Sequence, residues 1–282
     1  MHVNARKHFA IPPDERVRLA EIDPGDTGSF TAEADAHQAT HDALAAIADL
    51  QYRLYAEHRH ALLIVLQAMD AGGKDGTIRH VFGALSPLSA YAHAFKEPTP
   101  EEAAHDFLWR VHKVTPGHGE IAIFNRSHYE DVLVVRVHDL VPEKVWSKRY
   151  ARINAFEKTL VRGNTTILKF FLHISRDEQL RRFAQRLDDP AHQWKISESD
   201  YTERAYWDDY MRAYEAVLEK TSTARAPWYV IPADRKWFRN WAVAQIVAET
   251  LRTIDPKTRA PSVDIEEIRA KYHEVERSEH GA

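Results

Sequence analysis

The stretch LLIVLQAMDAGGKDG, residues 62–76, joins an apolar run to a turn that contains three glycines and a lysine. The apolar run predicts a buried strand. A glycine-rich turn between a strand and a helix presents backbone N–H groups and the positive end of the helix dipole to an anion. The usual phosphate-loop pattern has a glycine at position 68 and Ser or Thr after the lysine, where this chain has Ala68 and Asp75. The stretch therefore predicts a phosphate loop with two departures.

Four continuously apolar segments predict the strands of one parallel sheet that is covered on both faces. They are residues 61–67, 120–124, 165–174 and 228–233. Helical patterns precede and separate them, the first over about residues 31–57 and the last over about residues 235–252. Because strands alternate with helices, we expect a three-layer α/β domain with right-handed crossovers. Residues 1–29 are predicted to form an irregular arm.

Two further helices carry signals at their ends. Residues 142–164 begin with a proline and end at Gly163-Asn164, which is the usual asymmetry of a helix. A helix over residues 175–187 begins with Ser175, and Glu178 three residues later predicts a capping box.

Composition narrows the classes of function. The chain has no cysteine, which excludes disulfides and thiolate metal sites and agrees with a reducing compartment. No apolar stretch reaches the roughly 18 to 20 residues of a membrane span, and the N-terminus lacks the apolar core of a secretory signal. There is no HExxH zinc motif and no G-x-S-x-G hydrolase motif. We expect a cytoplasmic protein without a membrane partner, and the net charge of −4 does not by itself indicate a polyanion partner.

The loop itself offers candidate ligands for phosphate and metal. It follows the first strand at the first crossover, where open α/β sheets bind ligands. Lys74 would add a full positive charge there. Phosphates would repel Asp70 unless a cation lay between them, so Asp70 is the natural metal ligand where Ser or Thr is missing. Asp75 could serve as a second ligand or cap the helix, and the simplest alternative is a tight turn that needs glycine for positive φ.

The stretch IAIFNRSHYED, residues 121–131, brings a second group of polar residues to the same edge of the sheet. In P-loop NTPases this strand usually ends in an acid that binds Mg²⁺, and Asn125 stands there instead. Arg126 offers a planar fork suited to a phosphate. Glu130 and Asp131 could restore the missing negative charge. The alternative is a helix start with acids favourably placed in its first turn.

A basic segment over residues 181–210 is predicted to form a mobile lid. Its bases are Arg181, Arg182, Arg186, Lys195 and Arg204, and Pro190 interrupts it. Lid arginines that arrive on closure would neutralise phosphate charge and exclude water. The alternative is a solvated basic face.

Five motifs together closely resemble the polyphosphate kinase 2 family over about residues 10–255. They are LLIVLQAMDAGGKDGTIRHV, HDFLWRVH, IFNRSHYEDVLVVRV, RLDDPAHQWK and APWYVIPADRKWFRNWAV. The resemblance implies a three-layer P-loop kinase fold with a parallel sheet, a helical lid and a helical N-terminal extension. It also implies Mg²⁺-dependent transfer of a phosphoryl group between inorganic polyphosphate and a nucleotide. The loop and the NRSHYED motif most resemble the subgroup that acts on both AMP and ADP.

Carried onto this chain, the resemblance implies catalytic roles for Asp70, Lys74 and Arg126. The predicted phosphate- and nucleotide-binding residues are Ala71, Gly72, Gly73, Asp75, Gly76, Asn125, Arg136, Arg181, Arg182, Arg186 and Lys195. The predicted metal ligands are Asp70, Glu130 and Asp131, for Mg²⁺ with Mn²⁺ as an alternative. The domain division is residues 1–58 for the arm and first helix, 59–255 for the kinase-like domain and 256–282 for a tail.

The expected partners are polyphosphate and adenine nucleotides, with guanine nucleotides as an alternative and no nucleic acid. A homo-oligomer, dimer or tetramer, is also expected. Other functions stay open from the residues alone: an ATP-dependent P-loop kinase, an ADP-only polyphosphate kinase, or a non-catalytic nucleotide or polyanion binder.

Overall fold

The computed structural model describes residues 4–280 and has a six-stranded sheet in the order β1-β6-β5-β2-β4-β3. The strands are β1 (Ala10–Ile11), β2 (Ala61–Ala68), β3 (Ala90–Ala94), β4 (Ile121–Asn125), β5 (Thr165–His173) and β6 (Trp228–Pro232). All pairs are parallel except β1 with β6. The predicted α/β class with a parallel central sheet is confirmed, as are the four predicted strands.

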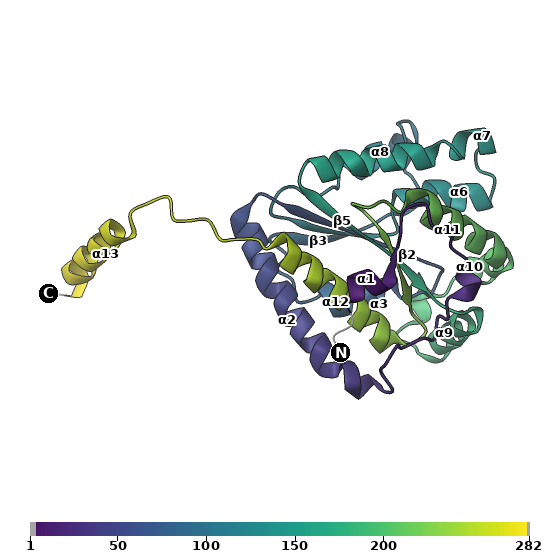
Figure 1. The fold of residues 1–282 in the computed structure, drawn as a ribbon, viewed down its shortest axis with the longest axis horizontal. Coiled ribbons are helices and arrows are strands. Elements are labelled where there is room, and N and C mark those ends of the chain that lie inside the picture. The colour runs from purple at the N-terminus through teal and green to yellow at the C-terminus, as the bar shows by residue number, and fades with distance from the viewer. Residues whose placement is uncertain (1–3, 281–282) are drawn as a thin grey trace.

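Helices cover both faces of this sheet (Figure 1). On one side lie α1 (Ala5–Phe9), α2 (Glu33–Glu57), α3 (Lys74–Phe82) and α12 (Lys236–Ile254). On the other lie α6 (Val134–Val137), α7 (Glu143–Trp146), α8 (Arg149–Arg162) and α11 (Trp207–Thr221). The remaining α-helices are α4 (Pro100–Ala103), α5 (Trp109–His112), α9 (Arg176–Asp188), α10 (Glu198–Glu203) and α13 (Ile265–His280). The short 3-10 helices are η1 (Leu19–Glu21), η2 (His128–Val132), η3 (Gln193–Lys195) and η4 (Arg204–Tyr206).

The strand order places the glycine-rich loop at the centre of the sheet. Every residue of β2 is buried, because β4 flanks it on one side and β5 on the other. The chain passes from β2 to the edge strand β3, returns to β4, and then crosses to β5 and β6. Such a reversal opens a crevice at the carboxyl ends of the strands. The loop after β2 and the residues after β4 therefore meet at one edge.

Several elements differ from the sequence prediction. The half-exposed edge strand β3 has no continuous apolar run, which is why it was missed. The arm is not wholly irregular, because β1 extends the sheet antiparallel to β6. The helix predicted over residues 142–164 is divided at Ser147-Lys148 into α7 and α8. At α9, Ser175 accepts the amide N–H of Glu178 at 3.0 Å, but Glu178 binds Arg182 at 2.6 Å, so the return half of the capping box is absent.

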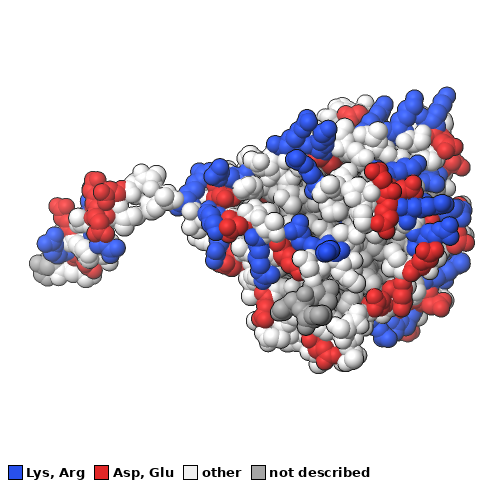
Figure 2. All heavy atoms as spheres, in the orientation of Figure 1, with Lys and Arg blue, Asp and Glu red and all other residues white. Residues whose placement is uncertain are grey.

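The C-terminal helix α13 lies apart from the body of the molecule at the end of an extended segment (Figure 1). None of its described residues is buried. Acidic and basic side chains are interspersed over the face shown in Figure 2, on α13 as on the body. Among the helices between residues 4 and 280, none combines the length and apolarity needed to cross a membrane.

Candidate active site

The loop between β2 and α3 is shaped by two residues in the left-handed region. Ala71 has φ 59° and Gly73 has φ 100°. Gly72 donates its N–H to the carbonyl of Met69 at 2.9 Å, and a Cβ at position 72 would lie 2.8 Å from that carbonyl oxygen and 2.4 Å from the Cβ of Ala68. Glycine is therefore required by close packing at position 72 and favoured by the backbone at position 73.

Lys74 turns its side chain back along the loop and is buried. Its Nζ donates to the carbonyl of Ala68 at 2.9 Å and lies 3.4 Å from the carbonyl oxygen of Met69. Burial, and then the positive charge of Arg126, lower the pKa of Lys74 to about 8. An anion bound at the loop would offset both effects, so the site is prepared for negative charge.

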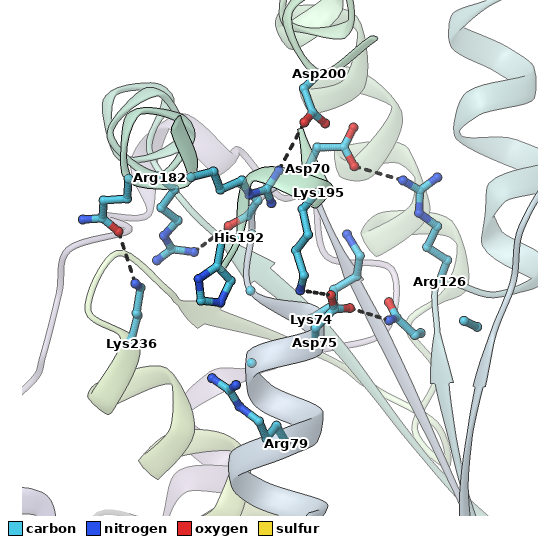
Figure 3. A pocket seen from close by; sticks show the side chains of 18 of the residues that line it. Asp70, Lys74, Asp75, Arg79, Arg126, Arg182, His192, Lys195, Asp200 and Lys236 are labelled. Atoms are coloured by element: carbon cyan, nitrogen blue, oxygen red, sulfur yellow. Dashed lines mark hydrogen bonds and ion pairs between the residues drawn. The ribbon is translucent and has the colours of Figure 1, made fainter. Parts of the chain in front are cut away.

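Asp70 and Glu130 both face the guanidinium of Arg126. Arg126 donates from Nη2 to Oδ1 of Asp70 at 2.9 Å (Figure 3). Its Nη1 lies 3.7 Å from Oε2 of Glu130. Burial alone would lower the pKa of Arg126, but the two carboxylates outweigh it and raise the pKa. Asp70 comes from the loop and Arg126 from the end of β4, as the sequence predicted for one edge of the sheet.

Asp75 joins the first turn of α3 to both neighbouring segments. Asn125 donates to its Oδ1 at 2.8 Å, and Lys195 donates to its Oδ2 at 3.0 Å (Figure 3). Burial alone would raise the pKa of Asp75, but the hydrogen bonds from Lys195 and Asn125 lower it. Because Lys195 belongs to the predicted lid, this ion pair holds the lid segment over the loop.

Helix α9 is attached to the outer side of the same loop. Arg182 donates to the carbonyl of Ala71 at 2.8 Å, and Gln179 donates to the carbonyl of Asp70 at 3.0 Å. Further along the lid, Arg186 binds Asp200 at 3.2 Å. The backbone of the loop is thus held by side chains of α9 as well as by its own turn.

Most of these residues line one cavity of about 1120 Å³ (Figure 3). Of the predicted residues it contains the whole loop from Asp70 to Gly76, with Asn125, Arg126, Arg182, Arg186 and Lys195. It also contains Lys96, which the sequence offered as a candidate base of a polyphosphate groove, and three bases that sequence reasoning missed, namely Arg79, Lys236 and Arg239. The structure therefore brings a phosphate-loop backbone and many cations around one space.

Four predicted residues lie outside this cavity. Arg136 donates to the hydroxyl of Tyr150 at 3.3 Å, and Arg181 binds Glu178 at 2.6 Å. The carboxylate of Asp131 binds Arg149 at 2.7 Å, and burial raises the pKa of Asp131 to about 6. Glu130 lines a small adjoining pocket together with Asp70 and Arg126.

The oxygen donors beside Arg126 fit a hard divalent cation. Mg²⁺ is commonly held by one or two carboxylates, with water and substrate phosphates filling the other positions. Asp70 and Glu130 supply such carboxylates, and Arg126 already provides positive charge between them. Within residues 4–280, no group of three or more His, Cys, Asp or Glu is placed to hold a metal. The donor set therefore suits a cation whose shell is completed by phosphate oxygens.

Comparison with known proteins decides the family. Residues 31–259 match the profile described as Polyphosphate kinase 2 (PPK2). The chain belongs to the polyphosphate kinase 2 family. The predicted resemblance is therefore confirmed.

Two curated relatives and one solved structure match this polyphosphate kinase 2 family member over nearly their whole lengths. It is 51% identical to the AMP/ADP-polyphosphate phosphotransferase of Meiothermus ruber, over 93% of this chain and 98% of that protein. It is 42% identical to the ADP-polyphosphate phosphotransferase of Rhodopseudomonas palustris, over 88% of this chain and 90% of that protein. The crystal structure of Polyphosphate Kinase 2 from Arthrobacter aurescens TC1 matches with a TM-score of 0.89 and 44% sequence identity. The match covers 95% of this chain and 98% of that chain.

The missed bases left a signal in the sequence of this family member. Lys236 and Arg239 lie three residues apart in the first turns of α12, directly after the carboxyl end of β6. In a parallel sheet that end shares an edge with the glycine-rich loop. Trp237, Phe238 and Trp241 stand around these two bases, and an aromatic-rich stretch of this kind usually indicates core packing rather than ligand binding.

Proposed function

We propose that the chain transfers a phosphoryl group between inorganic polyphosphate and AMP or ADP, forming ADP or ATP, with Mg²⁺. The observation that carries the proposal is the single cavity in which the loop N–H groups, Lys74, Arg126 and the lid bases surround one space. The name of the Meiothermus ruber relative, which is 51% identical, supports AMP and ADP as acceptors.

Phosphoryl transfer needs alignment and charge stabilisation more than it needs a nucleophile from the protein. The acceptor is a nucleotide phosphate, which is already anionic at neutral pH, so no strong general base is required. Lys74 and the loop N–H groups would bind the transferred phosphoryl group, and the fork of Arg126 would align it. Arg186 and Lys195 would neutralise phosphate charge from the lid and exclude water.

We propose Asp70 as the main protein ligand of the cation, with Glu130 beside it. When bound, Mg²⁺ would reduce the repulsion between the two anionic substrates. Arg126 pairs with both carboxylates in the described structure, so it would be released to contact phosphate when the cation takes its place. Mn²⁺ is the alternative cation.

The proposal extends to the identity of the acceptor and the state of the protein. We propose adenine nucleotides as the preferred acceptors, with guanine nucleotides as the alternative, and no nucleic-acid substrate. We also propose a cytoplasmic homo-oligomer, either a dimer or a tetramer. The division into an arm and helix (1–58), a kinase-like domain (59–255) and a tail (256–282) remains part of the same proposal.

The test uses AMP as the sole nucleotide, with polyphosphate, Mg²⁺ and no ATP. A parallel reaction replaces AMP by ADP. Product analysis by chromatography should show ADP first and then ATP. Formation of ATP from ADP with AMP inert would support an ADP-only enzyme instead. If neither nucleotide is phosphorylated, the proposed function is wrong.

A further inference from the structure

Arg239 is a buried cation without an acidic partner. The residue is only 2% exposed to solvent. Its Nε and Nη2 both donate to Oδ1 of Asn240, at 3.2 and 2.8 Å, and Nη1 has no acceptor among the described residues. Across residues 4–280 no carboxylate lies within 4.0 Å of it. A buried charge without a counter-charge is costly, and such groups are usually paired or bind an ion.

The neighbouring bases sharpen this imbalance. Arg182 is balanced by Glu178 at 2.6 Å and by carbonyl oxygens of the loop and of Ala233. Lys236 donates to the neutral Gln185 at 3.4 Å and forms no ion pair within 4.0 Å among the described residues. Burial, and then the like charge of Arg182, lower the pKa of Arg239 to about 10. Arg239 is still charged at neutral pH, so this end of the cavity holds uncompensated positive charge.

The guanidinium of Arg239 lies against the N-terminus of α3. A Cβ at Gly73 would lie 1.9 Å from its Nη1, and a Cβ at Gly76 would lie 3.3 Å from its Nη2. Gly76 is inside the helix and lacks a positive φ, so its backbone does not need glycine. Glycine is unfavourable in a helix relative to alanine. A side chain at position 76 would press on the guanidinium of Arg239, which would have to shift by a few tenths of an ångström.

Arg239 reaches the cavity from a different element than Arg126 does, from α12 rather than from the end of β4. It lines the cavity with Arg182 and Lys236. In the view of Figure 3, Arg182 and Lys236 lie on the side of the loop away from Arg126. The N-terminus of α3 is thus approached by cations from two directions, from the end of β4 and from α12.

We propose that Arg239 is a substrate-binding residue that contacts a phosphate group held at the N-terminus of α3. The inference rests on the proposed function and adds to it a second side of phosphate contact, supplied by α12. The shared ligand chemistry is a phosphoanhydride chain, which can come from inorganic polyphosphate or from the nucleotide. The alternative is that Arg239 has only a structural role, in which it packs against the glycine-rich loop and contacts no ligand.

The experiment compares Arg239→Gln with Arg252→Gln. The control removes the same charge from the same helix, at an exposed position outside the cavity. The dissociation constants of tripolyphosphate and of ADP are measured separately by calorimetry, together with the unfolding temperature of the ligand-free proteins. Arg239→Lys, which keeps the charge and the aliphatic stem, provides the test if Arg239→Gln does not fold.

Arg239→Gln should weaken binding of at least one ligand by about tenfold to a hundredfold, because a charge-assisted contact is lost. A loss confined to tripolyphosphate assigns the contact to polyphosphate, and a loss confined to ADP assigns it to the nucleotide. Arg239→Lys should show a smaller loss, and Arg252→Gln should bind like the wild type. Without ligand, Arg239→Gln should unfold at the same temperature as the wild type or at a higher one, since an uncompensated buried charge is removed.

Unchanged dissociation constants for both ligands in Arg239→Gln would overturn the inference, whatever the unfolding temperature. The binding measurement needs no turnover, so the two proposals fail separately. A wild type that binds tripolyphosphate through Arg239 but transfers no phosphate to AMP or ADP would contradict the proposed function alone. An active wild type with unaltered binding in Arg239→Gln would contradict this inference alone.

Discussion

Lys74 holds a positive charge that its surroundings disfavour, and this predicts a pH dependence. Its pKa is lowered to about 8, first by burial and then by Arg126. Below that pH the side chain is an ammonium that attracts phosphate, and above it the side chain becomes neutral. Because kcat/KM reports ionisation in the free enzyme, kcat/KM for polyphosphate should fall as pH rises through about 8.

The profile can be measured from about pH 6.5 to about pH 9.5, the range that brackets this ionisation. Lys74→Arg serves as the control, because arginine stays charged over the whole range. That variant is expected to be less active but to lack the falling limb. A wild-type profile that stays flat to the upper limit would show that Lys74 is not the titrating group.

Asp70 predicts a separate effect on the metal requirement. Its carboxylate faces the cavity, whereas the carboxylate of Asp131 is bound to Arg149. Asp70→Asn should raise the half-saturating Mg²⁺ concentration by about tenfold or more, with a smaller change in the KM for polyphosphate. Asp131→Asn should leave the Mg²⁺ requirement within about twofold. Equal increases in both requirements for Asp70→Asn would contradict a metal-ligand role.

The segment that carries Arg126 is anchored by a buried ion pair between secondary-structure elements. Glu157 of α8 accepts from Lys169 of β5 at 2.7 Å and from the hydroxyl of Tyr129 in η2 at 2.7 Å. His128 lies 3.3 Å from the same carboxylate. Lys169 and His128 are almost completely buried. The two residues that follow Ser127 are therefore anchored in the core, two and three positions after Arg126.

Replacing this buried carboxylate by a neutral group should lower the stability of the fold. Glu157→Gln leaves the ammonium of Lys169 without a counter-charge and should lower the free energy of unfolding by about 3–5 kcal/mol. The control is Glu267→Gln on α13, where Glu267 pairs with Lys271 at 2.6 Å on the surface. There the change should stay within about 0.5 kcal/mol. Urea unfolding measures both, and equally small effects would show that the buried pair does not stabilise the fold.

Among the secondary-structure elements, the sequence predicted best those strands whose own residues carry the signal. Continuous apolar runs marked β2, β4, β5 and β6, because strands covered on both faces have no polar side. The same criterion missed β3, whose side chains are half exposed at the sheet edge. It also could not indicate that Ala10 and Ile11 pair with β6, since that pairing joins residues more than 200 positions apart.

The site shows the same limit. Asp70, Lys74 and Arg126 were predicted because a strand end fixes where the next residues lie. The partners of Asp131 and Arg136 were not predictable, because Arg149 and Tyr150 reach them through the packing of α8. Tertiary packing, rather than local pattern, decides which charged residues reach the cavity.

For the whole molecule, the core and the C-terminal helix are expected to be energetically independent. No described residue of α13 is buried, whereas α12 packs along α2 and is mostly buried on the sheet side. Deleting residues 263–282 should therefore shift the unfolding temperature by less than about 2 °C. A larger decrease in a thermal melt would mean that α13 packs against protein in solution, within one chain or between copies.

The central claim is that polyphosphate itself donates the phosphoryl group at the cavity around the glycine-rich loop. Its most direct test supplies radiolabelled polyphosphate, ADP and Mg²⁺ without ATP and follows the label into nucleotide. The account predicts label in the terminal phosphate of ATP, and loss of nearly all of it in Lys74→Ala. Unlabelled nucleotide with the wild type, or equal labelling by Lys74→Ala, would contradict the claim.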